Sequence, residues 1–228
     1  MTVTERLTLL TSRLESVRQR IAQACERVHR DPAGVTLVAV TKTVDVDAVR
    51  MLIDLGVRDF GENRPQELWR KAAAIPDARW HFIGHLQRNK LDRTIPLVWL
   101  MHSVDSERLL AALGEFGVKR GSPVPVLLEV NCSREEAKGG FAPEALAGIV
   151  SRFPSLSGVS MTGLMTMAAY HDDPEACRPT FHELRELRNQ YGPAWPHLSM
   201  GMSNDFEVAI EEGATLVRVG TTLFEGLN

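Results

Sequence analysis

Apolar and polar residues follow two patterns along this chain, one typical of amphipathic helices and one of buried strands. Near the N-terminus, apolar side chains recur at three- and four-residue steps, namely at Leu7, Leu10, Leu14, Val17, Ile21, Ala24 and Val28. This spacing places them on one face of a helix. Such a stripe could serve a coiled coil or a dimer, but it more often packs on the body of its own domain, and we expect that here.

The next apolar run, Val35–Val40, is short, β-branched and without clear alternation, which predicts a strand buried on both faces. Further strands are predicted at 57–61, 80–84, 97–104, 124–131, within 156–167, at 197–201 and at 216–220. Helical patterns separate them, at 46–55, 64–74, 107–116, 142–153, 174–191 and 206–212, with a short helical stretch after the third strand.

Strands that alternate with helices predict a parallel sheet, and repeat spacings of roughly 15–35 residues suit βα units. We therefore expect an α/β fold, a closed (β/α)8 TIM-type barrel with an extra N-terminal helix. A doubly wound open sheet is the alternative, but no Gly-x-Gly-x-x-Gly motif follows the first strand. No linker rich in Pro, Gly or Ser interrupts the pattern, so residues 1–228 are expected to form a single domain.

Composition narrows the functional classes. Of the 228 residues 44% are hydrophobic, and the net charge of −3 without a long basic run argues against nucleic acid or anionic membrane as partner. Cys25, Cys132 and Cys177 are far apart and odd in number, so we expect reduced thiols and no metal site. Neither a signal-peptide core nor a long apolar span is present. We expect a soluble, cytoplasmic protein and, from its polar exposed faces, a monomer.

Lys42 follows the first strand and is the first candidate for chemistry. In a parallel barrel the C-terminal ends of the strands form the functional face. A lysine amine in a dry pocket loses proton affinity and can attack an aldehyde, whereas a lysine that only extends into solvent is the plainer alternative. Other polar residues are expected at the same face, namely Glu62, Asn63, His85, Gln87, Ser103, Asp105, Asn131 and Thr166.

The ends of the last two strands predict an anion site. Residues 199–205 run from a strand through a glycine into a helix, and Ser203 or Asn204 is expected to cap that helix. Free backbone N–H groups would then face the barrel mouth. After strand eight, Gly220 lets an anion approach the backbone beside Thr221. These loops are the usual phosphate site of the fold, although a plain N-cap and a plain turn are the alternative.

Arg218 is expected to point into the top of the barrel. Period-two alternation along strand eight puts Arg218 on the same face as Leu216 and Gly220, with the two intervening valines turned toward the helices. A buried guanidinium needs an acceptor, because an unpaired buried charge costs several kcal/mol. A carboxylate such as Glu129 or Glu62 could supply it, and a ring nitrogen of a ligand is the other possibility.

A lysine after strand one, an anion site after strands seven and eight and an inward arginine on strand eight together suggest pyridoxal phosphate. The stretches 37–43 (LVAVTKT), 60–63 (FGEN), 80–90 (WHFIGHLQRNK), 163–167 (GLMTM), 199–203 (SMGMS) and 218–221 (RVGT) carry a wider likeness. With them the sequence resembles, over nearly its whole length, the pyridoxal-phosphate homeostasis proteins, a family related to the N-terminal barrel of alanine racemase. The tail departs from the family pattern, because Glu225 follows Phe224 where many members carry glycine.

The resemblance implies a role for each candidate residue. Lys42 would form a Schiff base with the aldehyde of pyridoxal phosphate, and Asn63 would lie beside the ring. The phosphate would be held by Ser203, Gly220 and Thr221.

Two further basic residues acquire roles in the same way. Arg218 would face the pyridine nitrogen, and a guanidinium that is always protonated can only donate to that nitrogen. The ring would then be a poor electron sink, which favours holding the cofactor over stabilising a carbanion. Lys138, after strand five, matches a lysine found in many members and is hypothesised to assist exchange of the cofactor.

Two functional classes compete. The resemblance favours a non-catalytic carrier that buffers pyridoxal phosphate and delivers it to apo-enzymes, and so maintains vitamin B6 and amino-acid homeostasis. An amino-acid racemase is the alternative, but it needs a second base, which in alanine racemases is a tyrosine of a separate β domain. Neither Tyr170 nor Tyr191 fits that role, and we expect no β domain. A Schiff-base aldolase acting on a sugar phosphate is a third possibility, which the resemblance disfavours.

Overall fold

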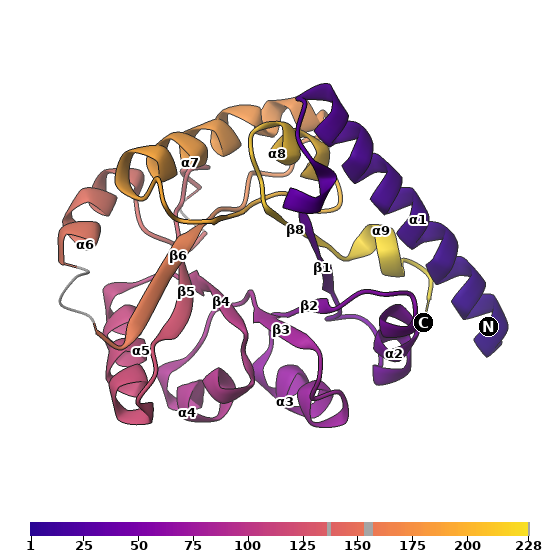
Figure 1. The fold of residues 1–228 in the computed structure, drawn as a ribbon, viewed down its shortest axis with the longest axis horizontal. Coiled ribbons are helices and arrows are strands. Elements are labelled where there is room, and N and C mark those ends of the chain that lie inside the picture. The colour runs from indigo at the N-terminus through magenta and orange to yellow at the C-terminus, as the bar shows by residue number, and fades with distance from the viewer. Residues whose placement is uncertain (136–137, 153–156, 228) are drawn as a thin grey trace.

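Parallel strands at the centre and helices around them make up the fold (Figure 1). The computed structural model describes residues 1–135, 138–152 and 157–227. In this part of the chain eight strands pair in sequence order, and β8 also pairs with β1, so the barrel is closed. The strands are β1 (Thr36–Val40), β2 (Asp59–Glu62), β3 (Arg79–Phe82), β4 (Leu100–Val104), β5 (Val124–Glu129), β6 (Val159–Met165), β7 (His197–Ser199) and β8 (Leu216–Val219). The predicted α/β barrel is confirmed.

Helices connect the strands on the outside of the barrel. They are α1 (Val3–Arg27), α2 (Val46–Asp54), α3 (Pro65–Ala74), α4 (Leu91–Thr94), α5 (Glu107–Arg120), α6 (Leu146–Arg152), α7 (Arg178–Tyr191), α8 (Phe206–Glu211) and α9 (Thr221–Phe224), with 3-10 turns between some of them. Residue 153 of the predicted sixth helix and residue 156 of the predicted sixth strand lie outside the described residues. The short helix α9 was not predicted.

Some predicted boundaries were wrong for identifiable reasons. Strand β7 ends at Ser199 rather than at 201, because Gly201 has a positive φ of 93° that a strand does not tolerate. Helix α5 continues past residue 116 to Arg120. Glycine is required at position 117 inside this helix, because a Cβ there would lie 1.8 Å from the carbonyl oxygen of Gly158.

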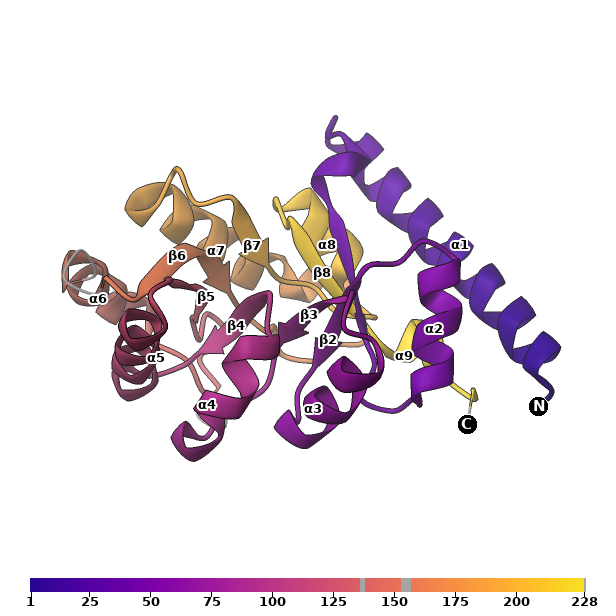
Figure 2. The same ribbon diagram turned by 60° about the horizontal axis from the view of Figure 1, so that its bottom comes forward.

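Helix α1 packs on its own domain, as predicted. A capping box of Thr2 and Glu5 begins the helix. Its buried face contacts α2, α8 and α9, and Figure 2 shows α1 running along the same side of the molecule as α2 and α9. The buried residues of that face are Leu10, Leu14, Val17, Ile21, Ala24 and Cys25. Among the described helices, none combines the length and the apolar composition needed to cross a membrane.

The apolar core has two parts, one outside the strands and one inside the barrel. Most buried side chains, including Val217 and Val219, form the layer between strands and helices. A smaller cluster fills the barrel itself, and its members are Val38, Leu100, Leu127, Met165 and Leu216. The predicted alternation along β8 is therefore confirmed, since Leu216 faces inward while its valine neighbours face the helices. The same alternation carries Arg218 inward.

Candidate functional site

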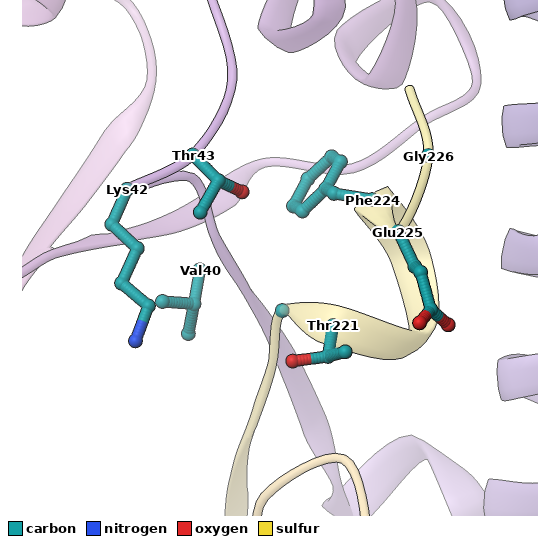
Figure 3. A pocket seen from close by; sticks show the side chains of 8 residues that line it. Val40, Lys42, Thr43, Thr221, Phe224, Glu225 and Gly226 are labelled. Atoms are coloured by element: carbon teal, nitrogen blue, oxygen red, sulfur yellow. The ribbon is translucent and has the colours of Figure 1, made fainter. Parts of the chain in front are cut away.

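Lys42 stands at the mouth of the barrel, two residues after β1, and its side chain is exposed. It lines a cavity of about 240 Å³ together with Val40, Thr43, Gly220, Thr221, Phe224, Glu225 and Gly226. Figure 3 shows the lysine chain extending beside Val40, while the hydroxyl of Thr221 points toward them from the start of α9. The ends of β1 and β8 are neighbours, so the structure brings together the predicted amine and part of the predicted anion site.

A buried ion pair lies under the Lys42 loop. The amine of Lys71 on α3 is 2.6 Å from Glu62 Oε1 at the end of β2 and donates to the carbonyl oxygen of Thr41 at 2.6 Å. The Thr41 hydroxyl donates to the same Glu62 oxygen at 2.6 Å. Both charged side chains are 0% exposed. The pair therefore holds the peptide that directly precedes Lys42.

Sequence reasoning missed Lys71. Helix α3 buries Leu68, Lys71 and Ala72, so the lysine lies on the apolar stripe three positions after a leucine. That position was the available signal, but a single lysine on a helix is usually solvated.

Asn63 follows Glu62 at the end of β2. Its Oδ1 is buried and has no hydrogen-bond partner among the described residues. The loop after β3 presses on it, because a Cβ at Gly84 would lie 2.2 Å from the Asn63 carbonyl oxygen. An unsatisfied amide oxygen at the mouth of the barrel is a group that a ligand donor can satisfy.

Arg218 points into the barrel and is 4% exposed. Its Nη1 donates to Ser199 Oγ at 2.5 Å and its Nη2 donates to the Thr166 carbonyl oxygen at 2.9 Å. Burial lowers the pKa of Arg218 to about 10, although the negative charges of Asp205 and Glu129 act to raise it. The guanidinium therefore stays protonated at neutral pH.

The acceptors of Arg218 differ from those considered from the sequence. Glu62 is engaged by Lys71, and Glu129 acts on the guanidinium through its charge, while a hydroxyl and a carbonyl accept the hydrogen bonds. Burial, and then the nearby Asp105, raise the pKa of Glu129 to about 7. This carboxyl group therefore titrates near neutrality beside the buried arginine.

Ser203 organises the predicted anion site, but not as expected. Its Oγ accepts from the backbone N–H groups of Gly220 and Thr222, each at 3.3 Å, and so caps α9. The expectation that Ser203 or Asn204 caps the following helix, α8, is wrong. Asp205 holds that N-cap position and makes no side-chain cap bond, since its carboxylate accepts from Met202 N at 2.6 Å.

The remaining residues of this loop are also placed. Asn204 Nδ2 donates to the His171 carbonyl oxygen at 2.8 Å. Ser203 accepts both of its bonds and therefore keeps a hydroxyl hydrogen that it can donate. Ser203 contacts Gly220, which lines the Lys42 cavity together with Thr221. The hydroxyl hydrogens of Ser203 and Thr221 are donors suited to an anion, while the Gly220 N–H already donates to Ser203.

Lys138 lies in the loop after β5. Its amine donates to the Ala168 carbonyl oxygen at 2.8 Å and forms an ion pair with Glu135. It is therefore engaged beyond the end of β6, and it is not among the residues that line the Lys42 cavity. Residues 136 and 137, which precede Lys138, lie outside the described residues.

Comparison with known proteins identifies the relatives of this chain. The family model for the N-terminal domain of alanine racemase matches residues 12–227. The pyridoxal phosphate homeostasis protein of Aquifex aeolicus is 45% identical over 218 residues, which cover 93% of this chain and 96% of that protein. The human pyridoxal phosphate homeostasis protein is 36% identical over 231 residues, with 92% and 84% covered.

Solved structures give the same result. PipY of Synechococcus elongatus PCC7942, solved with pyridoxal phosphate bound, is similar with a TM-score of 0.80 and 33% identity, covering 94% of this chain and 99% of its own. Alanine racemase from Corynebacterium glutamicum, at 16% identity and a TM-score of 0.76, shares the fold alone and is covered over 61% of its length. The chain belongs to the pyridoxal phosphate homeostasis protein family, on the barrel of the alanine racemase N-terminal domain.

Proposed function

We propose that this protein binds pyridoxal phosphate through Lys42, buffers it and delivers it to enzymes that need it, without catalysing a reaction of its own. The observation that carries the proposal is the meeting of an exposed lysine amine with the Ser203–Gly220 contact at one cavity. Pyridoxal phosphate brings an aldehyde that bonds reversibly to a lysine amine, together with a phosphate and a ring nitrogen. Relatives named for its homeostasis support the assignment.

The residues present fit this cofactor. Ser203 and Thr221 would hold the phosphate with their hydroxyl groups, and Gly220 would add its N–H where the phosphate replaces Ser203 as its acceptor. A guanidinium has five N–H donors, and Arg218 keeps donors beyond those given to Ser199 and Thr166. One of them would face the ring nitrogen.

Asn63 and Arg218 would each offer the ring a hydrogen bond. The buried and unsatisfied Oδ1 of Asn63 would accept a hydrogen bond beside the ring. Arg218 stays protonated and can only donate, so the nitrogen would remain unprotonated. This arrangement favours holding the cofactor over activating a substrate.

Neither tyrosine is placed as the second base that a racemase needs. Tyr170 is 78% exposed, and Tyr191 on α7 packs against the outer core. Neither tyrosine lines the Lys42 cavity. A carrier needs no second base, so the proposed function does not depend on either tyrosine.

The visible spectrum of the purified protein tests the proposal. We expect an absorption band of lysine-bound cofactor, fixed by borohydride on the peptide that contains Lys42 and found there by mass spectrometry. Lys42→Ala should lose the band and the labelled peptide, whereas Lys119→Ala, a change of an exposed lysine at the far end of α5, should keep both. A colourless wild-type protein, or robust racemisation of amino acids, would overturn the proposal.

Delivery is tested separately. Cofactor-loaded protein is mixed with a cofactor-free pyridoxal-phosphate enzyme, and the rate of activation is compared with the rate of spontaneous release. Faster activation than release indicates direct transfer, and equal rates indicate buffering alone.

We propose that Lys138 assists this exchange, as the family resemblance implies. Its amine is tied to Ala168 and Glu135, so it would have to leave these contacts to act. Lys138→Ala should slow release and transfer, with Lys119→Ala as the control. Unchanged rates in Lys138→Ala would remove the hypothesis.

We also propose that the chain acts as a single-domain monomer in the cytoplasm. The three cysteines are free and buried, which suits a reducing compartment. Sedimentation equilibrium at micromolar concentration should give the monomer mass, and a stable dimer would contradict this part of the proposal.

A further inference from the structure

A continuous chain of buried polar side chains crosses the interior of the barrel and ends on Arg218. His81 Nε2 is 3.0 Å from Asp59 Oδ1, and His81 Nδ1 is 2.8 Å from His102 Nε2. His102 Nδ1 is 2.8 Å from Ser199 Oγ, which accepts from Arg218 Nη1 at 2.5 Å. No member is more than 5% exposed. We call these residues, Asp59, His81, His102, Ser199 and Arg218, the interior chain.

The two ends of the interior chain lie at opposite ends of the barrel. Asp59 is the first residue of β2, and its Oδ2 accepts from Arg79, the first residue of β3, at 2.6 Å. Arg218 is one residue from the C-terminal end of β8. The chain therefore connects the N-terminal face of the barrel with the mouth where Lys42 stands.

The chemistry of the end groups gives the chain one direction. Arg218 can only donate, so Ser199 Oγ accepts there and has its own hydrogen free for His102 Nδ1. Burial lowers the pKa of His102 well below its usual value and also lowers that of His81, so each ring carries one proton. His102 then donates from Nε2 to His81 Nδ1.

The carboxylate at the far end requires the same direction. His81 donates from Nε2 to Asp59, which can only accept when ionised. In the reverse arrangement a bare imidazole nitrogen would face the carboxylate, and two acceptors would repel each other. Asp59 thus fixes the tautomers of both histidines and, through them, the orientation of the Ser199 hydroxyl.

We propose that Asp59, His81 and His102 are positioning residues for Arg218, and that they set the affinity for the cofactor from the opposite end of the barrel. The inference rests on the proposed function, because it concerns how the guanidinium is held toward the ring. With its lone pair aimed at Nη1, Ser199 holds one edge of the guanidinium, and the Thr166 carbonyl oxygen holds another.

Asp59→Asn should reverse the chain without changing its shape. Arg79 requires an acceptor, so the asparagine oxygen should face Arg79 and its NH2 group should face His81. Both histidines would then carry their proton on Nδ1, and Ser199 would receive donors from both sides. The hydrogen bond between Ser199 and Arg218 should weaken as a result.

Two measurements test this step by step. In cofactor-free protein labelled with ¹⁵N-histidine, NMR should show both rings protonated on Nε2 in the wild type and on Nδ1 in Asp59→Asn. Cofactor affinity, followed by absorbance, should fall about tenfold in Asp59→Asn, the scale of one weakened charged hydrogen bond. His182→Asn is the control. It changes an exposed histidine on α7 that pairs with Glu212 outside the barrel, and affinity should stay within about twofold.

A double variant separates this role from general destabilisation. With Ser199→Ala the link to Arg218 is gone, so adding Asp59→Asn should change affinity less than about twofold. An equal loss in both backgrounds, unchanged tautomers, or unchanged affinity in Asp59→Asn would each overturn the inference. Should Asp59→Asn not fold, Ser199→Ala alone must weaken binding about tenfold, and unchanged affinity overturns the inference. If the wild type binds no pyridoxal phosphate, the proposed function fails, while the histidine tautomers still decide the direction of the chain.

Discussion

Lys42 and Arg218 stand at the ends of paired strands at one barrel mouth, yet they differ in almost every physical respect. Lys42 is exposed at the edge of a cavity, and its amine has no hydrogen bond or ion pair within the part of the chain that the structure describes. Arg218 is 4% exposed and is held by a hydroxyl and a carbonyl. One side chain is unrestrained by such contacts, and the other is held by two of them.

The difference corresponds to two tasks in holding a releasable cofactor. A group that bonds to the aldehyde and lets it go must change position and partner, so few native contacts should restrain it. A group that only donates to the ring works best when it is already oriented, because no ordering cost then falls on binding. Beneath Lys42, the backbone is held by the buried Lys71–Glu62 pair, because Lys71 also donates to the carbonyl oxygen of Thr41.

The comparison predicts that the cost of removing a cation follows its burial, and Lys71 gives the largest effect. Lys71→Met would leave Glu62 buried without its partner and should reduce the free energy of unfolding by about 3–5 kcal/mol. Urea unfolding at pH 7 measures it. Arg70→Met, which removes the exposed neighbour that pairs with Glu67 on the same helix, should cost under about 0.5 kcal/mol. Equal losses in the two variants would break the comparison.

A reciprocal exchange tests the two mouth cations directly. Arg218→Lys keeps the charge but loses the planar pair of donors to Ser199 and Thr166, and should destabilise by about 3 kcal/mol. Lys42→Arg should stay within about 0.5 kcal/mol, because the side chain is exposed. Thermal and urea unfolding of both proteins without cofactor provide the values. Comparable destabilisation by the two changes would show that Lys42 is held by contacts of its own.

The arrangement of the two cations was predictable from local pattern, whereas their partners were not. Alternation along β8 placed Arg218 inward because side chains on a strand alternate strictly. Strand order placed Lys42 at the mouth, since all eight strands run parallel. The acceptors of Arg218 lie 19 and 52 residues away in sequence, and only closure of the barrel brings them together.

The same limit explains the other misses. Four residues of α9 are too few to show helical periodicity, so Ser203 was assigned to the wrong helix. The interior chain joins residues from β2, β3, β4, β7 and β8, and its histidines have no marker in the sequence that separates them from core histidines. Directions of side chains follow from local geometry, but partners follow from register between distant strands.

The pH dependence of stability tests the cost of ionising Glu129, the carboxyl group near Arg218. Because the folded pKa of Glu129 is about 7, above its ordinary value, the folded state retains a proton that the unfolded chain has released. Stability should therefore fall as pH rises from about 4.5 to 7, and the full cost should apply above 7. Glu129→Gln removes this fall, so its stability relative to wild type should increase by up to about 3 kcal/mol between pH 4.5 and pH 8. Glu15→Gln, on the exposed face of α1, should give a curve parallel to wild type. A parallel curve for Glu129→Gln would show that burial and Asp105 do not raise the pKa of this carboxyl group.

Ser203 is intermediate in exposure between the exposed Lys42 and the buried Arg218, and its hydroxyl contacts backbone N–H groups, not a charged side chain. Ser203→Ala removes the acceptor for the Gly220 and Thr222 N–H groups and should cost about 1 kcal/mol, the usual cost of losing a helix cap. It should also weaken inorganic phosphate binding, followed as a shift in the unfolding temperature with added phosphate. Asn204→Ala, which removes a bond to the His171 carbonyl instead, should leave that phosphate shift unchanged. If both variants kept the full shift, the anion would be held by groups other than Ser203. Phosphate binding would then depend on Thr221 and the backbone at the start of α9, which line the cavity beside Lys42.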